Sequence, residues 1–209
     1  YLITAVMGGN EKATQALINN KRSPYLYKKL CDYKMVNLVM PYKKVTSLKG
    51  IDIRRASEED RVDLLNFLSA QHKNKPFGFT REYFERALKE WDGLKINSFI
   101  IIKENDRIVA TTATWNPSPS KKIIVESLPW KLKLLNNLVS PFTKTSRVGE
   151  ELKVEYLNFL TLTDKNDLKA IVEFLRVEGA FKKYDLISFG DFEPFNYREA
   201  LKGLVMDLT

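Results

Sequence analysis

The sequence predicts an α+β (α/β) fold in which a central sheet is flanked by helices. Three observations lead to this prediction. Runs of strand-like residues recur along the chain, and segments with apolar residues at helical spacing lie between them. Capping or turn residues separate most of the strand-like runs from the helical segments. The chain has 209 residues, of which 44% are hydrophobic, so it can bury the core of one domain, or of one domain and part of another.

The first fifty residues predict a strand, a helix and two further strands. Gly8-Gly9-Asn10 forms the first turn, and Asn10 is a suitable N-cap for the helix that follows it. The two later strands could pair around Cys31-Asp32, and Pro41 ends the second of them. The predicted ranges are 1–7 for the first strand, 11–18 for the helix, 25–30 and 33–40 for the later strands, and 43–50 for a linker.

The pattern restarts at residue 51. Ser57-Glu58-Glu59-Asp60 resembles a capping box, Thr80 is a second N-cap, and Gly93 closes the second helix. Glu104-Asn105-Asp106 is a tight turn between two strand-like runs, which together predict a hairpin. The predicted ranges are strands over 51–55, 98–103, 107–115, 155–162, 186–189 and 205–208, helices from 62, 80, 164 and 197, and an irregular insertion over 116–150 that contains a helical stretch, Trp130–Leu138.

The composition excludes several classes of protein. A single cysteine, Cys31, excludes a disulfide framework and cysteine-based metal sites, and a single histidine, His72, argues against histidine metal sites and a Ser–His–Asp triad. We therefore expect no metal. The longest apolar runs, such as Phe99–Ile102, are far shorter than the ~20 residues that cross a bilayer. A lone thiol and no signal-peptide pattern predict a cytoplasmic protein, and a start at Tyr1 within a strand favours a piece of a longer one.

The positive charge is concentrated at the start of the chain. The net charge is +8, and residues 1–50 carry nine basic against two acidic residues, whereas residues 51–209 are almost balanced. This shift supports a boundary near Lys49-Gly50. A basic segment can attract nucleic acid, although a solvated lysine-rich surface explains it equally simply.

The order of elements from Ile51 resembles that of the GNAT superfamily of N-acyltransferases. Residues 51–68 (IDIRRASEEDRVDLLNFL) are similar to the family's first strand and helix, residues 98–115 (SFIIIKENDRIVATTATW) to its central hairpin, and residues 157–175 (LNFLTLTDKNDLKAIVEFL) to its cofactor strand and following helix. The resemblance implies a GNAT-like mixed, mostly antiparallel sheet. Residues 1–48 likewise resemble the C-terminal part of a preceding GNAT-like domain, which would make 51–209 the second domain of a tandem protein, with the insertion at 116–150.

The sequence departs from the family where the cofactor would bind. An active GNAT domain carries a Gln/Arg-x-x-Gly-x-Gly/Ala loop, because backbone N–H groups must approach the pyrophosphate of acetyl-CoA closely. The matching residues here, Thr163-Asp164-Lys165-Asn166-Asp167, include no glycine and two carboxylates. We therefore expect residues 51–209 to bind acetyl-CoA weakly or not at all.

The preceding domain offers other cofactor-binding candidates. Gly8 and Gly9 follow a predicted strand and open a helix, and Asn10 matches the Asn that helps to hold the cofactor in the family. The family's general acid, a Tyr seven residues later, is Leu17 here, so the catalytic residues stay unknown.

Several other residues have both a functional and a structural interpretation. Trp115, Lys121, Trp130 and Tyr156 are candidates for a substrate cleft beside the insertion, although core packing explains the aromatic ones equally well. His72 lies in a polar stretch and is expected at the surface. The carboxylates of Glu150, Glu151, Glu155 and Asp164 are expected to be solvated rather than paired for catalysis.

The resemblance implies that the intact protein is an N-acetyltransferase, which transfers an acetyl group from acetyl-CoA to the primary amine of a small molecule or peptide. Residues 51–209 would then be a non-catalytic companion domain. The first alternative is a non-enzymatic binding or scaffolding module, and the second is nucleic-acid binding through the basic segment. We expect no membrane partner, and a homo-oligomer is compatible with the sequence.

Overall fold

The computed structural model of the chain describes residues 6, 10–18, 27–29, 32–39, 44–73, 78–119, 121–127, 148–192 and 196–202, and the chain divides into two compact units, 1–32 and 33–209. The first unit contains α1 (Glu11–Ile18), as predicted. Its N-cap is Asn10, whose Oδ1 accepts a hydrogen bond from the N–H of Ala13 at 3.1 Å. No residue of α1 is buried.

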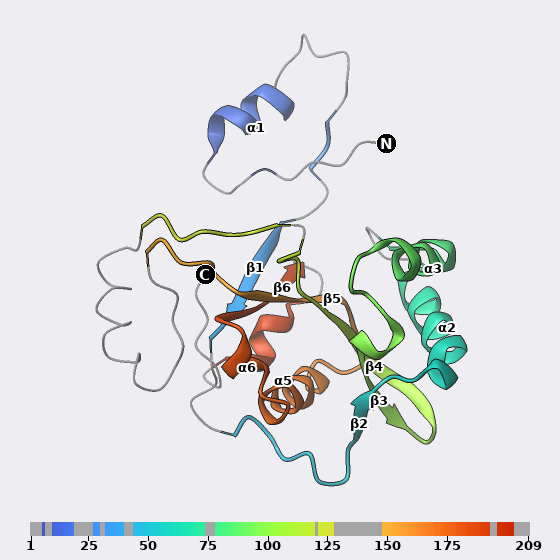
Figure 1. Ribbon diagram of the computed structural model, residues 1–209. Helices are drawn as coiled ribbons and strands as arrows, with labels where there is room; N and C mark the ends of the chain where they lie inside the picture. The colour runs from blue at the N-terminus through green and yellow to red at the C-terminus, as the bar shows by residue number, and fades with distance from the viewer. Residues whose placement is uncertain are drawn as a thin grey trace. The chain divides into compact units, whose positions relative to one another are not determined.

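The second unit is built on one sheet with the strand order β1-β6-β5-β4-β3-β2 (Figure 1). Neighbouring strands are antiparallel except β5 and β6, which run parallel. This confirms the predicted α+β class with a mixed, mostly antiparallel sheet flanked by helices. The strands are β1 (Tyr33–Leu38), β2 (Asp52–Arg55), β3 (Phe99–Glu104), β4 (Arg107–Trp115), β5 (Val154–Leu162) and β6 (Leu186–Phe192).

Helices cover both faces of this sheet (Figure 1). One face carries α2 (Arg61–His72) and α3 (Arg81–Glu90), and the other carries α5 (Asp167–Val177) and α6 (Ala180–Lys183). Side chains alternate along β3, so Ile100 and Ile102 join the apolar cluster under α5, whereas Phe99 and Ile101 join the cluster under α2 and α3. The continuous apolar run of β3 is therefore explained by burial on both faces.

The predicted helix caps at Ser57 and Thr80 and the predicted turn at Asn105-Asp106 are present in the structure. The backbone N–H and the hydroxyl of Ser57 both donate to Asp60 Oδ2, at 2.9 and 3.0 Å, and a 3₁₀ turn there leads into α2. The N–H of Tyr83 donates to Thr80 Oγ1 at the start of α3. Asn105 and Asp106 both have positive φ, as a two-residue hairpin turn requires, and they connect β3 to β4.

The partner of β1 differs from the prediction. β1 pairs with β6, from Tyr33 opposite Phe192 to Leu38 opposite Ile187. Of the predicted strand over 25–30, residues 27–29 are described, and they have no regular structure. Val36 and Leu38 are buried in the cluster under α5, and this burial favours the long-range pairing. The two compact units divide before Tyr33. The predicted domain boundary at 48–51 stays a prediction. The tandem GNAT-like arrangement stays a prediction.

Further along, the helix predicted from 164 to about 180 corresponds to α5, and the short helix α6, which was not predicted, follows Gly179, whose φ is +79°. The helix predicted from 197 is a 3₁₀ turn over Tyr197–Leu201. Within the insertion, Ile124 and Glu151 form an isolated antiparallel bridge. The predicted strands at 205–208 and over most of 1–7, and the helical stretch Trp130–Leu138, lie outside the described residues. Among the helices that the structure describes, none is long and apolar enough to cross a membrane.

Candidate functional site

The junction between β5 and α5 is where the GNAT resemblance places a cofactor pyrophosphate. The chain leaves β5 at Thr163 and turns at Asp164, whose Oδ1 accepts from the backbone N–H of Asn166 at 2.9 Å and from its side-chain amide at 3.1 Å. The N–H groups of Asp167 and Leu168 donate to the carbonyls of Asp164 and Lys165. The N–H groups at the start of α5 therefore already have partners within the turn.

Carboxylates dominate the electrostatics of this junction. Burial, and then the charges of Asp164 and Glu104, raise the pKa of the Asp167 carboxyl. Lys165 and Lys169 belong to the same stretch, but the Lys169 ammonium donates to Asn166 Oδ1 at 3.0 Å. Because a pyrophosphate needs free N–H donors and a positive potential, these residues do not fit the diphosphate of acetyl-CoA.

A second candidate site lies on the α2/α3 face, around a bulge in β5. The register between β4 and β5 shifts between the pairs Thr111–Thr161 and Ala113–Asn158, so β5 holds one extra residue. Phe159 lies in this bulge with a φ of +55°. Its ring is packed against Phe84, Trp91 and Phe99, with ring centroids 5.3, 5.4 and 6.1 Å apart.

His72 is attached to this bulge, which corrects the expectation of a surface histidine. Its Nε2 lies 3.1 Å from Thr161 Oγ1, and its Nδ1 accepts from the N–H of Phe79 at 3.4 Å. The Thr161 hydroxyl in turn donates to the carbonyl of Phe159 at 3.0 Å. The half-buried imidazole stacks on the Phe79 ring, 5.6 Å between centroids. His72 thus connects the end of α2 to the bulge.

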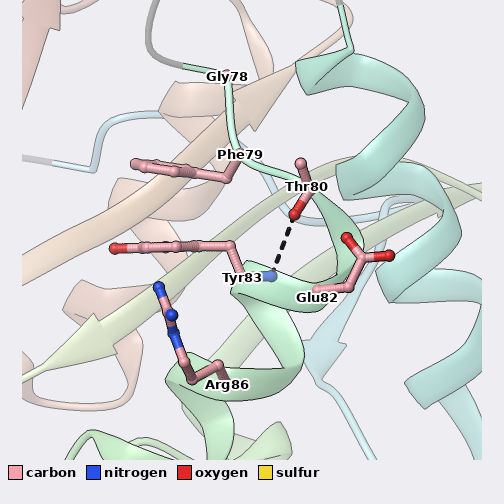
Figure 2. A pocket seen from close by; sticks show the side chains of 6 residues that line it. All are labelled: Gly78, Phe79, Thr80, Glu82, Tyr83 and Arg86. Atoms are coloured by element: carbon pink, nitrogen blue, oxygen red, sulfur yellow. Dashed lines mark hydrogen bonds between the residues drawn. The ribbon is translucent and has the colours of Figure 1, made fainter. Parts of the chain in front are cut away.

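A pocket of about 370 Å³ opens beside this aromatic cluster (Figure 2). Figure 2 shows the Phe79 and Tyr83 rings lying parallel, with centroids 4.3 Å apart and planes inclined by 10°. The Arg86 guanidinium lies 5.6 Å from the Tyr83 centroid, on the side away from Phe79. The other lining residues are Gly78, Thr80 and Glu82, and the Thr80 hydroxyl lowers the pKa of the exposed Glu82 carboxyl. None of these residues belongs to the β5–α5 junction.

The residues predicted to line a substrate cleft are brought together only in part. Trp115 and Tyr156 are cross-strand partners on β4 and β5, and the Trp115 indole N–H donates to the carbonyl of Asp92 at 2.9 Å. Lys121 is exposed, and its backbone N–H donates to Pro117. Trp130 lies outside the described residues. The cleft therefore stays a prediction.

The other predicted site residues have separate outcomes. Asn10 serves as the N-cap of α1, and its role toward a cofactor stays a prediction. Gly8, Gly9 and Cys31 lie outside the described residues. The described lysines among residues 1–50 are all exposed, which leaves nucleic-acid binding an open prediction. Across the described part of the chain, no group of three or more His, Cys, Asp or Glu residues could hold a metal ion.

Glu155 differs from its expected solvated state. Its carboxyl is buried near the start of β5, and burial raises its pKa, while the charges of Arg55 and Lys183 oppose the shift. Asp164, by contrast, is exposed in the turn before α5. These two carboxylates stand at opposite ends of β5, so they do not form a catalytic pair.

Two solved structures are similar to this chain. A functionally unknown conserved protein from Staphylococcus epidermidis ATCC 12228 is 11% identical with a TM-score of 0.45, and the match covers 84% of this chain and 59% of that one. The loading GNATL domain of CurA from Lyngbya majuscula is 15% identical with a TM-score of 0.31, and the match covers 63% and 56%. The chain thus spans less than two thirds of the length of either. No family model matches the sequence, and no curated protein matches it significantly.

Proposed function

We propose that residues 51–209 form a non-catalytic, GNAT-like companion domain of an N-acetyltransferase. In this proposal the intact protein transfers an acetyl group from acetyl-CoA to a primary amine, and the groups that perform the chemistry lie outside this domain. The supporting observation is the β5–α5 junction, where α5 begins at Asp167 and the charges of Asp164 and Glu104 act on the Asp167 carboxyl. A polyanion brought to that point would meet carboxylates in place of free N–H donors.

The proposal is tested by thermal unfolding of the chain with and without millimolar acetyl-CoA. A ligand at about 100 times its Kd stabilises a two-state domain by about 2.7 kcal/mol, which is readily measured. We expect no change in Tm for the wild-type chain. An upward shift for the wild-type chain would overturn the proposal, because it would require a working phosphate site.

A matched pair of variants tests whether carboxylate charge causes the expected lack of pyrophosphate binding. The Asp164→Asn/Asp167→Asn variant removes the two negative charges of the turn, whereas Glu199→Gln removes an exposed charge on the 3₁₀ turn after β6. If carboxylate repulsion contributes to the missing affinity, calorimetric titration with pyrophosphate gives tighter binding to the first variant than to the second. Equal pyrophosphate binding to both would remove the electrostatic argument.

A second candidate function, a binding module without chemistry, is favoured by the pocket beside Phe79 and Tyr83. Stacked aromatic rings next to a guanidinium and a carboxylate can hold an amphipathic ligand (Figure 2). The two candidates are distinguished with the intact protein and a panel of primary amines, by following thiol release from acetyl-CoA. Release of thiol that depends on the amine supports the companion role, and its absence supports the binding module.

A further inference from the structure

His72, the single histidine of the chain, packs against one wall of the pocket beside Phe79 and Tyr83. The Phe79 ring lines this pocket and stacks on two other rings. One is the Tyr83 ring, 4.3 Å away between centroids, and the other is the half-buried imidazole, 5.6 Å away. The position of this wall therefore depends on His72.

The imidazole also holds the backbone of Phe79. Its Nδ1 accepts a hydrogen bond from the N–H of Phe79 at 3.4 Å, while its Nε2 lies 3.1 Å from the Thr161 hydroxyl on β5. Phe79 immediately precedes Thr80, the N-cap of α3, whose Oγ1 accepts from the N–H of Tyr83. The contact at Nδ1 thus fixes the backbone at the point where the chain enters both α3 and the pocket.

Protonation of the imidazole removes this contact and leaves the one to β5. A protonated ring carries an N–H on both nitrogens, so Nδ1 changes from a hydrogen-bond acceptor into a donor. It then faces the N–H of Phe79, and two donors do not bond to each other. Nε2 donates to the Thr161 oxygen in the charged ring as it does in the neutral one. The loss is therefore confined to the pocket side of the ring.

The groups packed around the imidazole come from β5 and from the start of α3. β5 contributes the hydroxyl of Thr161, and the α3 side contributes the rings of Phe79 and Phe84. The Tyr83 phenol lies next to Phe79 in the stack, and a phenol stays neutral at mildly acidic and neutral pH. The charged side chains near these ends of α2 and α3 are exposed and keep their charges between about pH 5.5 and 8. They are Lys73, Glu82 and Arg86.

We propose that His72 is a pH-sensitive contact, which holds the Phe79 wall of the pocket when the imidazole is neutral and releases it when the imidazole is protonated. An imidazole changes its charge between about pH 5 and 8. The pocket of Figure 2 is then the form present at about pH 8, and its Phe79 wall is displaced at about pH 5.5. This inference rests on the binding module, the second candidate function, because it adds regulation to the same pocket.

Amide hydrogen exchange tests the contact at about pH 8 and about pH 5.5, with each rate divided by the intrinsic rate at that pH. The Phe79 amide is expected to lose protection roughly tenfold or more when His72 is protonated. The Trp91 amide is the internal control, because it donates to Ala87 at the other end of α3 and its protection stays the same. Unchanged protection at Phe79, or an equal loss at both amides, would overturn the proposal.

Proton NMR of the aromatic rings reports the wall itself. The Tyr83 ring lies parallel to the Phe79 ring, whose ring current shifts the Tyr83 resonances upfield (Figure 2). On acidification these resonances are expected to move downfield, with the same midpoint as the His72 ring protons. Tyr83 resonances that stay in place, or that move with a different midpoint, would contradict the release of Phe79.

Three variants separate the two nitrogens of the ring. His72→Asn places a side-chain oxygen near the position of Nδ1 and does not titrate, so Phe79 is expected to stay protected at both pH values. His72→Ala has no acceptor, so Phe79 is expected to be unprotected at both. Thr161→Val removes the partner of Nε2 and keeps Nδ1, so the pH response of Phe79 is expected to persist. A pH response that persists in His72→Asn or His72→Ala would assign it to another group and overturn the proposal.

The failure of this inference is distinguishable from the failure of either candidate function, because its tests need no ligand. Thiol release that depends on the amine removes the binding module and leaves the pH response of Phe79 in place. Constant protection of the Phe79 amide removes the pH-sensitive contact alone, and the pocket is then the same at both pH values. Acetyl-CoA binding by the wild-type chain bears only on the companion role.

Discussion

The carboxylate of Glu173, on α5, accepts a hydrogen bond from the backbone N–H of Val45, 128 positions earlier in the chain, at 3.0 Å. Arg176 donates two further bonds to the same carboxylate, at 2.9 and 2.7 Å. The pKa of Glu173 is lowered, mainly by Arg176 and also by the Val45 N–H. One buried acid therefore fastens the segment that follows β1 to the helix that covers the sheet.

Glu173→Gln is expected to lower the free energy of unfolding by about 1–3 kcal/mol. The amide keeps the shape, but it loses the charge that faces Arg176 and replaces one of the two acceptor oxygens by an NH2 donor. Urea denaturation at pH 7 measures this loss. Glu85→Gln is the control, since its partner Arg81 lies at the surface and the pair is worth less than ~1 kcal/mol.

The contribution of Glu173 to stability is expected to depend on pH in a defined direction. The folded pKa of Glu173 lies below its unfolded value of about 4.3, so its contribution is present above that value and is lost as the pH falls through the folded pKa. The stability difference between Glu173→Gln and the wild-type chain should shrink below pH 4. A difference that grows on acidification would contradict this assignment.

Asp60→Asn is expected to destabilise the second unit by about 3 kcal/mol. The carboxylate is 3% exposed and accepts two bonds from Arg54, at 2.6 and 2.8 Å, while the Lys103 ammonium lies 2.9 Å away. The substitution leaves two cations facing a neutral amide. Thermal unfolding measures the effect, and Glu58→Gln, in an exposed pair with Arg61, is the near-neutral control.

The acid limb of the stability curve distinguishes this role of Asp60 from simple packing. Arg54 holds the pKa of Asp60 well below its usual range. Wild-type stability should therefore fall as the pH drops below about 3.9, the unfolded value, whereas Asp60→Asn lacks this contribution and gives a flatter curve. Parallel curves for the two proteins would argue against a charged Asp60.

The elements that could be predicted from the sequence are those whose signals are local. The β3–β4 hairpin needs only two apolar runs around Asn105 and Asp106, and α1 needs only Asn10 before its amphipathic segment. The pairing of β1 with β6 joins residues about 150 positions apart, and no local pattern specifies it. The sequence therefore predicts most of the elements and the fold class well, and the long-range pairing of the strands poorly.

The candidate sites show the same limit. The sequence alone shows that the segment around Asp164 contains no glycine, so it predicts the acidic junction between β5 and α5. The bulge at Phe159 has no such signal, because a phenylalanine with positive φ is held by its surroundings and not by its own preference. His72 was expected at the surface because its partner Thr161 lies 89 positions further on.

The positive φ of Phe159 can be tested by comparing the stabilities of glycine and alanine variants at this position. Both Phe159→Gly and Phe159→Ala lose a buried ring, at a cost of about 3–5 kcal/mol. Because φ is positive there, glycine avoids a penalty of about 1–2 kcal/mol, so the glycine variant should be the more stable of the two. At Phe99, whose backbone is extended, the alanine variant should instead be more stable than the glycine variant by about 0.5–1 kcal/mol. Urea denaturation of the four variants decides this, and the same order at both positions would contradict the left-handed bulge.

The hydrogen bonds around His72 predict which ring nitrogen carries the proton when the imidazole is neutral. Nδ1 accepts from the N–H of Phe79, and the Thr161 hydroxyl uses its proton on the carbonyl of Phe159, so Thr161 can only accept from His72. The neutral ring should therefore carry its proton on Nε2, which long-range ¹H–¹⁵N spectra at pH 8 report directly. Thr161→Val should shift the Nε2 resonance, whereas Thr111→Val, which removes a hydroxyl bonded to Ile100, should leave it unchanged. A ring protonated on Nδ1 would break the chain of bonds from α2 to the bulge, and Phe159 would then need another support for its backbone.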